Sequence, residues 1–308
     1  MWAENHLPGM LGKALKRRYQ FPVVVDLHGA VPEESLELWG DRPPSLTQRL
    51  KMRAINEAER RIVREADGIV VVSRSMVEHL ELKYGAQLGR HIEYPCAVDL
   101  ELFVSPTEGA ATRSREGFGL PKNEPLLVYS GGMQPWQMVE DTLMLWQALC
   151  ARKRCAMLVL TTDSHDAHAL VTKVFRSTAC SRPLIMSVPA PAMSALVPAG
   201  DLGFVLRRDS IVNRVSFPTK CGEYLACGLP VVTSAFAGPC ASIVASEHIG
   251  RVVDLGCPPS TSAPIVEELL DAVMADRNDW RRRCRSAAER IYNSATLAQR
   301  LTECLAAI

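Results

Sequence analysis

Lys220 and Glu223 are the residues of this sequence whose types and spacing suggest chemistry most directly. They stand three positions apart at the predicted start of a helix after Pro218-Thr219, so their side chains share one face near the helix N-terminus. A cation beside free backbone amides suits a diphosphate, and a carboxylate one turn later suits a sugar diol. The preceding strand ends at Arg207-Arg208, and Gly228-Leu-Pro230 requires a sharp turn after the helix. The alternative interpretation is an ordinary Glu–Lys helix pair.

A second candidate site is the glycine-rich segment Tyr129-Ser-Gly-Gly-Met-Gln-Pro-Trp136, where a predicted strand ends and a helix begins. Glycines there allow close backbone approach, and the N-terminus of the helix offers free N–H groups and a positive dipole end to a phosphate. The segment is neither a GxGxxG fingerprint nor a Walker A loop, so a plain tight turn is the alternative.

The elements that must position these residues alternate between strand-like and helix-like segments, which is typical of a parallel α/β architecture. Six strands joined by crossover helices predict a doubly wound sheet of the Rossmann type in the second part of the chain. The predicted strands are 22–27, 68–73, 91–95, 125–130, 155–161, 183–187, 202–206, 229–233 and 251–254, and the main predicted helices there are 135–152, 165–176, 219–227 and 264–275.

The predicted domain organisation follows from these segments. We expect a partial N-terminal domain over 1–108, a linker over 109–124, a donor-side domain over 125–279, and a helical segment over 280–308 that packs back toward the N-terminal domain. That last segment is expected to break at Asn293-Ser294. Only three strands precede the linker, so the first half of a doubly wound domain is expected to be missing and the chain to be truncated at its start.

The composition restricts the class of protein. The chain has 308 residues, 47% hydrophobic and 22% charged, which fits a globular protein of two domains and excludes a disordered or fibrous one. A net charge of +1 argues against a partner that is nucleic acid. No apolar run reaches the ~18 residues of a membrane helix, and no secretory signal is visible. Ten cysteines without a CxxC pair indicate reduced thiols and a cytoplasmic location.

Several motifs together resemble a known family. The pattern P-x-K-x-x-E-Y-L-A-x-G-L-P-V-V, from Pro218 on, is similar to the donor-binding core of retaining GT-B glycosyltransferases of the family 4-like group. Val70-Val-Val-Ser73, Tyr94-Pro-Cys-Ala-Val-Asp-Leu-Glu-Leu-Phe103 and Val128-Tyr-Ser-Gly-Gly-Met-Gln-Pro-Trp-Gln137 look like further motifs of that family. The resemblance implies an α/β protein of the GT-B type, with two Rossmann-like domains facing a cleft.

The resemblance also implies roles for individual residues. Glu223 would bind the donor ribose, while Lys220, Arg207 and the amides around Gly131 and Gly132 would hold the diphosphate. Val188, at the end of a strand, would lie beside the base, and Thr219 and Gln137 complete the implied donor site. His28 matches the active-site histidine that faces the transferred sugar; the alternative is a loop histidine with a backbone partner.

The sequence departs from the family pattern at two places. Val215 stands where the family often has a second glutamate, and the first donor-domain loop has Gly132 and Gln137 where the family often has an arginine and a lysine. The positive charge for the phosphates must therefore come from Arg207, Arg208 or Lys220.

The function that the resemblance implies is transfer of a hexose from a nucleotide-diphosphate sugar to a glycan or lipid-linked acceptor, with retention of configuration, as in polysaccharide biosynthesis. No cofactor and no metal are implied, and the one histidine cluster, Asp163-Ser-His-Asp-Ala-His168, lacks a third ligand at typical spacing. Lys13, Lys16, Arg17 and Arg18 could meet anionic lipid headgroups at the inner face of the membrane; the favoured alternative is an ordinary solvated helix face. The alternatives are a GT-B-fold nucleotide-sugar epimerase and a non-catalytic nucleotide-sugar-binding remnant.

Overall fold

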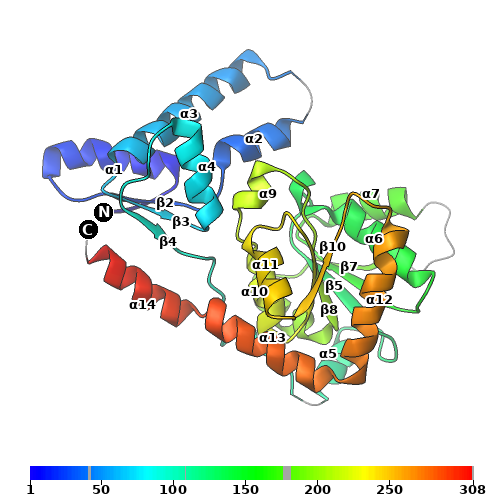
Figure 1. Cartoon of the computed structure of the whole chain (residues 1–308). Helices are drawn as coiled ribbons and strands as arrows, with labels where there is room; N and C mark the ends of the chain where they lie inside the picture. The colour runs from blue at the N-terminus through cyan, green and yellow to red at the C-terminus, as the bar shows by residue number, and fades with distance from the viewer. Residues whose placement is uncertain (41–42, 108, 176–181, 307–308) are drawn as a thin grey trace. The chain divides into compact units, whose positions relative to one another are not determined.

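The computed structural model describes residues 1–40, 43–107, 109–175 and 182–306 (Figure 1). The chain forms two compact units. The first comprises residues 1–96, 209–217 and 295–308, and the second comprises residues 97–208 and 218–294. The division at residue 97 falls earlier than the segment 109–124 that composition suggests as a linker, because that segment contains helix α5, Ala110–Gly117, whose Ser114 hydroxyl donates to the Ala195 carbonyl of the second unit.

The second unit is built on a six-stranded sheet in which every pair is parallel and the order is β10-β9-β8-β5-β6-β7. The six predicted strands are all present. Counted from β5, this order is the 3-2-1-4-5-6 order of a doubly wound fold, and the reversal lies between β5 and β8. Ligands bind such sheets beyond the carboxyl ends of the strands at that switch point. The strands are β5 Leu126–Ser130, β6 Ala156–Leu160, β7 Leu184–Met186, β8 Leu202–Val205, β9 Val231–Ser234 and β10 Gly250–Val253.

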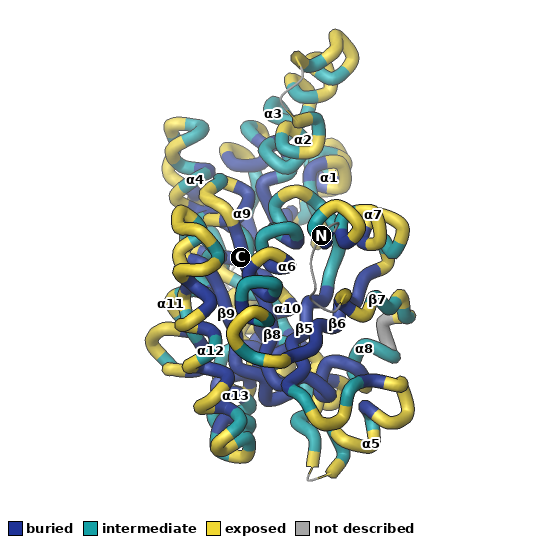
Figure 2. Tube along the Cα trace, turned by 90° about the vertical axis from the view of Figure 1, so that its right-hand side faces the viewer, coloured by how far each residue is buried: buried dark blue, intermediate teal, exposed yellow. Residues whose placement is uncertain are grey.

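The helices of the second unit bury the apolar faces of this sheet. Trp146 of α6 is fully buried against Phe175, with ring centroids 5.5 Å apart, in a core that also contains side chains of α12. Figure 2 shows β5, β6, β8 and β9 in dark blue as the buried centre of this unit. The helical elements are α5, η1 Pro135–Gln137, α6 Val139–Cys150, α7 Ser164–Val174, α8 Ala190–Leu196, η2 Val197–Ala199, α10 Thr219–Ala226, α11 Pro239–Ser246, α12 Pro259–Ala275 and α13 Arg277–Ile291.

The first unit has a four-stranded parallel sheet in the order β1-β2-β3-β4. Three of its strands agree with the prediction, and β1, Trp2–Glu4, is an addition that pairs with β2 in the register Trp2↔Val24. The other strands are β2 Val24–Leu27, β3 Gly68–Val71 and β4 His91–Glu93, and the helices are α1 His6–Tyr19, α2 Val31–Trp39, α3 Leu46–Glu65, α4 Arg74–Tyr84, α9 Ile211–Val215 and α14 Ser294–Leu305. Ser45 and Gln48 form a capping box at the start of α3, and the predicted helix break at Asn293-Ser294 is confirmed.

Strand β1 lies at the edge of this sheet, and the neighbouring helix α1 carries an exposed apolar stripe. Leu7, Leu11, Leu15 and Tyr19 recur at a spacing of four residues and are all exposed, as is Trp2 on the strand. The opposite side of α1 packs closely, since Gly9 leaves no room for a side chain between Ile62 and Val25.

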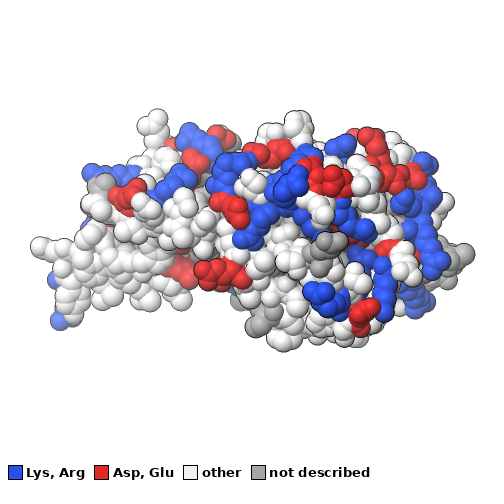
Figure 3. Space-filling model, turned by 90° about the horizontal axis from the view of Figure 1, so that it is seen from below, with Lys and Arg blue, Asp and Glu red and all other residues white. Residues whose placement is uncertain are grey.

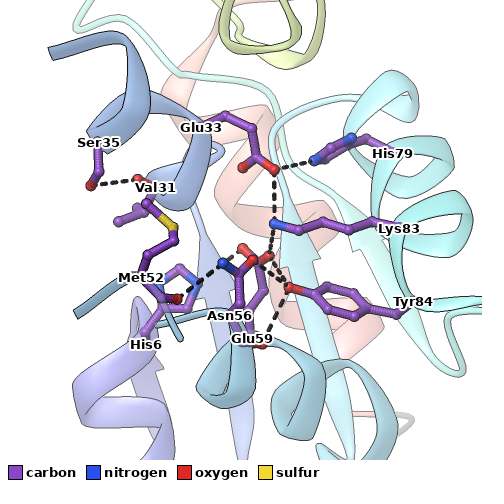
Figure 4. A network of polar contacts seen from close by, with 10 residues as sticks. All are labelled: His6, Val31, Glu33, Ser35, Met52, Asn56, Glu59, His79, Lys83 and Tyr84. Atoms are coloured by element: carbon purple, nitrogen blue, oxygen red, sulfur yellow. Dashed lines mark hydrogen bonds and ion pairs between the residues drawn. The ribbon is translucent and has the colours of Figure 1, made fainter. Parts of the chain in front are cut away.

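A buried network of charged side chains joins four helices of the first unit (Figure 4). Glu59 of α3 is fully buried and accepts hydrogen bonds from His6 of α1 at 3.0 Å, Lys83 of α4 at 2.7 Å and the Tyr84 hydroxyl at 2.6 Å. Lys83 also contacts Glu33 of α2 at 2.8 Å. Burial alone would raise the pKa of Glu33, but the partners His79 and Lys83 lower it to about 2. Lys83 thus holds two carboxylates, one from α2 and one from α3.

This network predicts a loss of stability in acid. Because the folded-state pKa of Glu33 is depressed, its contribution is fully present above about pH 4.5 and is lost as the pH falls toward 2. Glu33→Gln is expected to lower the free energy of unfolding by about 1 kcal/mol at pH 7, a value reduced by solvent screening, and by much less at pH 3. Urea unfolding at both pH values measures the difference. Glu78→Gln, which removes an exposed pair with Arg74, is the control, and an equal effect of both variants at pH 7 would contradict the prediction.

Candidate functional site

Helix α10 and the loops after β5 and β8 bring the predicted donor residues together at the switch point of the second sheet. Lys220 is the second residue of α10, whose N-cap, Pro218, makes no side-chain capping bond. Arg207 follows β8, and its backbone is fixed by Ser234, which accepts from the Arg207 amide at 2.7 Å and donates to its carbonyl at 2.6 Å. The strand ends and the helix start therefore direct two cations to one place.

Gln137 joins these two cations. Its side-chain carbonyl accepts hydrogen bonds from Lys220 Nζ and from an Arg207 guanidinium nitrogen, both at 2.8 Å. Lys220 Nζ also lies 4.2 Å from the centre of the Tyr129 ring, a cation–π contact. The neutral amide of Gln137 thus bridges the two positive charges.

Both cations are buried without a carboxylate at ion-pair distance among the described residues. Arg207 is 5% exposed and Lys220 is 8% exposed. Burial lowers the pKa of Lys220 well below its usual value, and repulsion by Arg207 lowers it further. Burial also lowers the pKa of Arg207. A buried charge costs free energy unless it is paired, so this arrangement favours an anion as the partner of both side chains.

The glycine loop after β5 lies against Lys220. Gly131 has a φ of 136°, and a Cβ atom built there would approach Lys220 Nζ to 2.7 Å. The Tyr129 hydroxyl donates to the Gly132 carbonyl at 2.6 Å, and the Ser130 amide donates to the buried Tyr224 hydroxyl at 2.7 Å. Two tyrosines thus fix the shape of the loop beside the cations, and a side chain at Gly131 would disturb it.

Glu223 lies one turn along α10, and its side-chain carboxylate makes no hydrogen bond or ion pair with any described residue. Burial raises its pKa, and the charge of Lys220 partly opposes that shift. A mostly buried carboxylate without a protein donor suits a ligand that brings its own hydroxyl groups.

The remaining predicted donor residues make no side-chain hydrogen bond or ion pair with the cluster of Lys220, Arg207 and Gln137. Thr219, the first residue of α10, is exposed, and Val188 follows β7 at the edge of the sheet, where it is half-buried. The contacts described above connect four of the predicted residues: Gly131, Gln137, Arg207 and Lys220. Val188 takes part in none of these contacts. Tyr129, Tyr224 and Ser234 were missed by sequence reasoning, although all three lie inside or beside the quoted motifs.

His28 belongs to the first unit, where it follows β2. Its ring nitrogen Nε2 lies 3.1 Å from Asp26 Oδ2 and 3.7 Å from Glu4 Oε1, and its side chain is about half exposed. Asp26 is buried, and burial raises its pKa while His28 acts in the opposite direction. The predicted active-site histidine therefore has carboxylate partners from β1 and β2, which sequence reasoning had not identified.

The structure also places Val215 and the basic residues of α1 that the sequence analysis singled out. Val215 packs in the core of the first unit, and its carbonyl accepts from the Ser73 hydroxyl at 2.7 Å. Lys13 pairs with Glu65 and Lys16 with Asp67, so part of the basic cluster on α1 is neutralised. In the described part of the chain, no helix is long and apolar enough to span a membrane, and no group of three or more side chains could hold a metal ion.

Sequence comparison relates the chain to glycosyltransferases. Residues 1–97 match the glycosyl transferase 4-like domain family. A D-inositol 3-phosphate glycosyltransferase of Xylanimonas cellulosilytica is 29% identical over 288 residues, covering 92% of this chain and 64% of that protein. A second such enzyme, from Catenulispora acidiphila, is 28% identical over 278 residues, covering 86% of this chain and 61% of that protein. The chain spans less than two thirds of the length of these two relatives.

Structural comparison shows which fold the chain has. Sucrose-phosphate synthase of Thermosynechococcus elongatus superposes with a TM-score of 0.71 at 19% identity, covering 98% of this chain and 71% of that one. HepE of Anabaena, solved with UDP-glucose, superposes with a TM-score of 0.73 at 16% identity, covering all of this chain and 78% of that one. These findings confirm the predicted resemblance: the chain has the GT-B fold of glycosyltransferases, and its first 97 residues match the model of the glycosyl transferase 4-like domain.

Proposed function

We propose that this protein transfers a hexose from a nucleotide-diphosphate sugar to a glycan or lipid-linked acceptor, with retention of configuration. The observation that carries the proposal is the pair of buried cations, Arg207 and Lys220, which share only the neutral Gln137 amide. They lie at the sheet's switch point beside the uncapped start of α10. A diphosphate supplies the two negative charges that this arrangement lacks.

The same charges explain how the leaving group would be stabilised. As the bond from the sugar to the diphosphate breaks, negative charge develops on the phosphate oxygens. Lys220, Arg207 and the free amides at the start of α10 are already fixed in place, so they stabilise that charge without reorganising. Glu223 would accept hydrogen bonds from the ribose hydroxyls, and His28 would face the transferred sugar.

Calorimetric titration with UDP-, GDP- and ADP-glucose tests the donor half of this proposal. We expect one of the three to bind, with equal affinity in the presence and absence of EDTA. Product analysis with and without an acceptor then separates the alternatives. Conversion of the donor sugar without acceptor would indicate an epimerase, and binding without any turnover would indicate a nucleotide-sugar-binding protein. Failure of all three nucleotide sugars to bind would overturn the proposal.

Glu223 gives a specific prediction. Glu223→Ala is expected to weaken binding of the nucleotide sugar by about 1–3 kcal/mol, because it removes a charged hydrogen-bond acceptor for the ribose. Glu223→Gln, which keeps the size but loses the charge, should retain part of this affinity. Calorimetry on the three proteins measures the series, and equal affinities would remove Glu223 from the site.

A further inference from the structure

A cavity of about 400 Å³ lies in the second unit, between α5 and the start of α13. It opens beside Asp201, the residue immediately before β8, and therefore at the amino ends of the strands. The candidate donor site lies at the carboxyl ends of the same sheet. The two sites are thus on opposite edges, and none of the proposed donor residues lines this cavity.

The cavity wall carries more positive charge than its carboxylates neutralise. Buried Asp201 accepts from Arg277 on one oxygen at 2.9 Å, and from Arg115 and the Leu126 amide on the other, both at 2.8 Å. Both oxygens are therefore occupied. Arg281, one turn along α13 from Arg277, also lines the cavity, and its guanidinium makes no hydrogen bond or ion pair with a described residue.

The other charged groups at the cavity do not neutralise this excess of positive charge. Asp276 caps α13 by accepting from the Asp279 amide at 3.0 Å, and Lys122 pairs with Glu116 at 2.9 Å. Burial lowers the pKa of Arg281, attraction by Asp201 opposes that shift, and repulsion by Arg277 and Arg115 adds to it. Four cationic side chains therefore line the cavity together with two carboxylates, those of Asp201 and Asp276. Figure 3 shows many Lys and Arg side chains, with some Asp and Glu among them, on the right-hand part of the molecule seen from below.

The opposite wall is the start of helix α5. Its N-cap residue, Gly109, supplies no side-chain cap, and no acidic residue occupies its first turn. Ala111 and Thr112 of that turn line the cavity. The first amides of a helix and its positive dipole end favour an anion. The start of α5 thus contributes positive electrostatic potential to the cavity, as do the arginines of α13.

We propose that this cavity binds a small multivalent oxyanion, either inorganic phosphate or the phosphate group of an ester. Arg281 and Arg277 provide the charged donors, and the first turn of α5 provides backbone donors. Arg115 remains with Asp201 and holds that carboxylate away from the anion. The proposal is independent of the donor site, because it uses residues of the other edge of the sheet.

The test is titration of the whole protein with pyrophosphate and with inorganic phosphate, followed by amide NMR. The titration uses protein that carries Lys220→Met as its background. This substitution weakens anion binding at the candidate donor site, so that binding in the cavity between α5 and α13 is observed separately. We expect the amides of Ala111 and Thr112 and the side-chain signal of Arg281 to shift. Arg281→Gln should weaken this binding at least tenfold, whereas Arg282→Gln, which loses an exposed pair with Asp279, should change it less than twofold.

Two outcomes would overturn the proposal. One is a set of shifts confined to residues 129–137 and 207–223, which would assign all anion binding to the donor site. The other is equal affinity of Arg281→Gln and the background protein. The amide shifts of the background protein decide the question even if Arg281→Gln does not fold. A phosphate ester that binds more tightly than inorganic phosphate would identify the ester as the ligand.

Discussion

Replacing Lys220 by methionine is expected to abolish most donor binding while making the ligand-free protein more stable. The ammonium group is buried, and it is repelled by Arg207. Methionine fills a similar volume without the charge, so the free energy of unfolding should rise by on the order of 1 kcal/mol despite the lost contact with Gln137. The affinity for the nucleotide sugar should fall by about 2–5 kcal/mol, since the diphosphate loses a buried charged partner.

The stability gain should depend on pH in a defined direction. The folded-state pKa of Lys220 lies below its unfolded value of 10.5, so the unfolded chain binds more protons between these two values. The stability of the unmutated protein should therefore rise with pH across this window, and its difference from Lys220→Met should become smaller. Urea unfolding between pH 6 and pH 10 measures both curves. Lys173→Met, at an exposed lysine paired with Glu140, is the control. A constant difference across the range would contradict the depressed pKa.

The second large effect is expected at Gly131. Gly131→Ala forces an L-residue into a φ of 136° and places its methyl group against Lys220 Nζ. We expect a loss of stability of about 1–3 kcal/mol from backbone strain. We also expect a loss of donor affinity of at least about 2 kcal/mol, because the displaced ammonium group leaves its position beside Gln137.

Gly119→Ala is the matched control for this substitution. Gly119 also has a positive φ, of 66°, but an added Cβ there would meet no atom within 4 Å, and Gly119 is not one of the proposed donor residues. Thermal unfolding should show a loss of stability for both variants, whereas calorimetry should show a loss of donor affinity for Gly131→Ala alone. If Gly119→Ala weakens binding as much as Gly131→Ala, the contact of Gly131 with Lys220 does not explain the effect.

The fold of the second unit could be predicted from sequence because its signals are local. Short apolar strands such as Leu126–Ser130 alternate with helices, and Gly228-Leu229-Pro230 marks the sharp turn between α10 and β9. The same local signals indicated Lys220 and Arg207, whereas Gln137 was implied as a site residue by the family resemblance. The hydrogen bonds from Lys220 and Arg207 to Gln137 could not be predicted. Gln137 and Lys220 are 83 residues apart in the sequence and come together only when the sheet has formed.

The first unit was harder to predict. Strand β1 has three residues, and Pro8, Gly9 and Gly12 weaken the helix signal of α1. Helix α9 lies between β8 and α10 in the sequence but belongs to the first unit. Val215, at the end of α9, packs with Val71 and Met76 in the core of the first unit. Local sequence patterns cannot predict this packing, because Val215 is far from the other two residues in the sequence. The carboxylate partners of His28 likewise depend on the pairing of β1 with β2.

The edge strand β1 and the apolar stripe of α1 have a practical consequence for work with the protein. An unpaired strand edge is a template for addition of a further strand, and exposed leucines add a hydrophobic driving force for self-association. Trp2 of β1 and Leu7, Leu11 and Leu15 of α1 are all exposed, and Glu4 is the one charged residue of the strand. Aggregation in concentrated solutions should therefore begin at this edge, and a lysine in place of Leu11 is the simplest change to improve solubility.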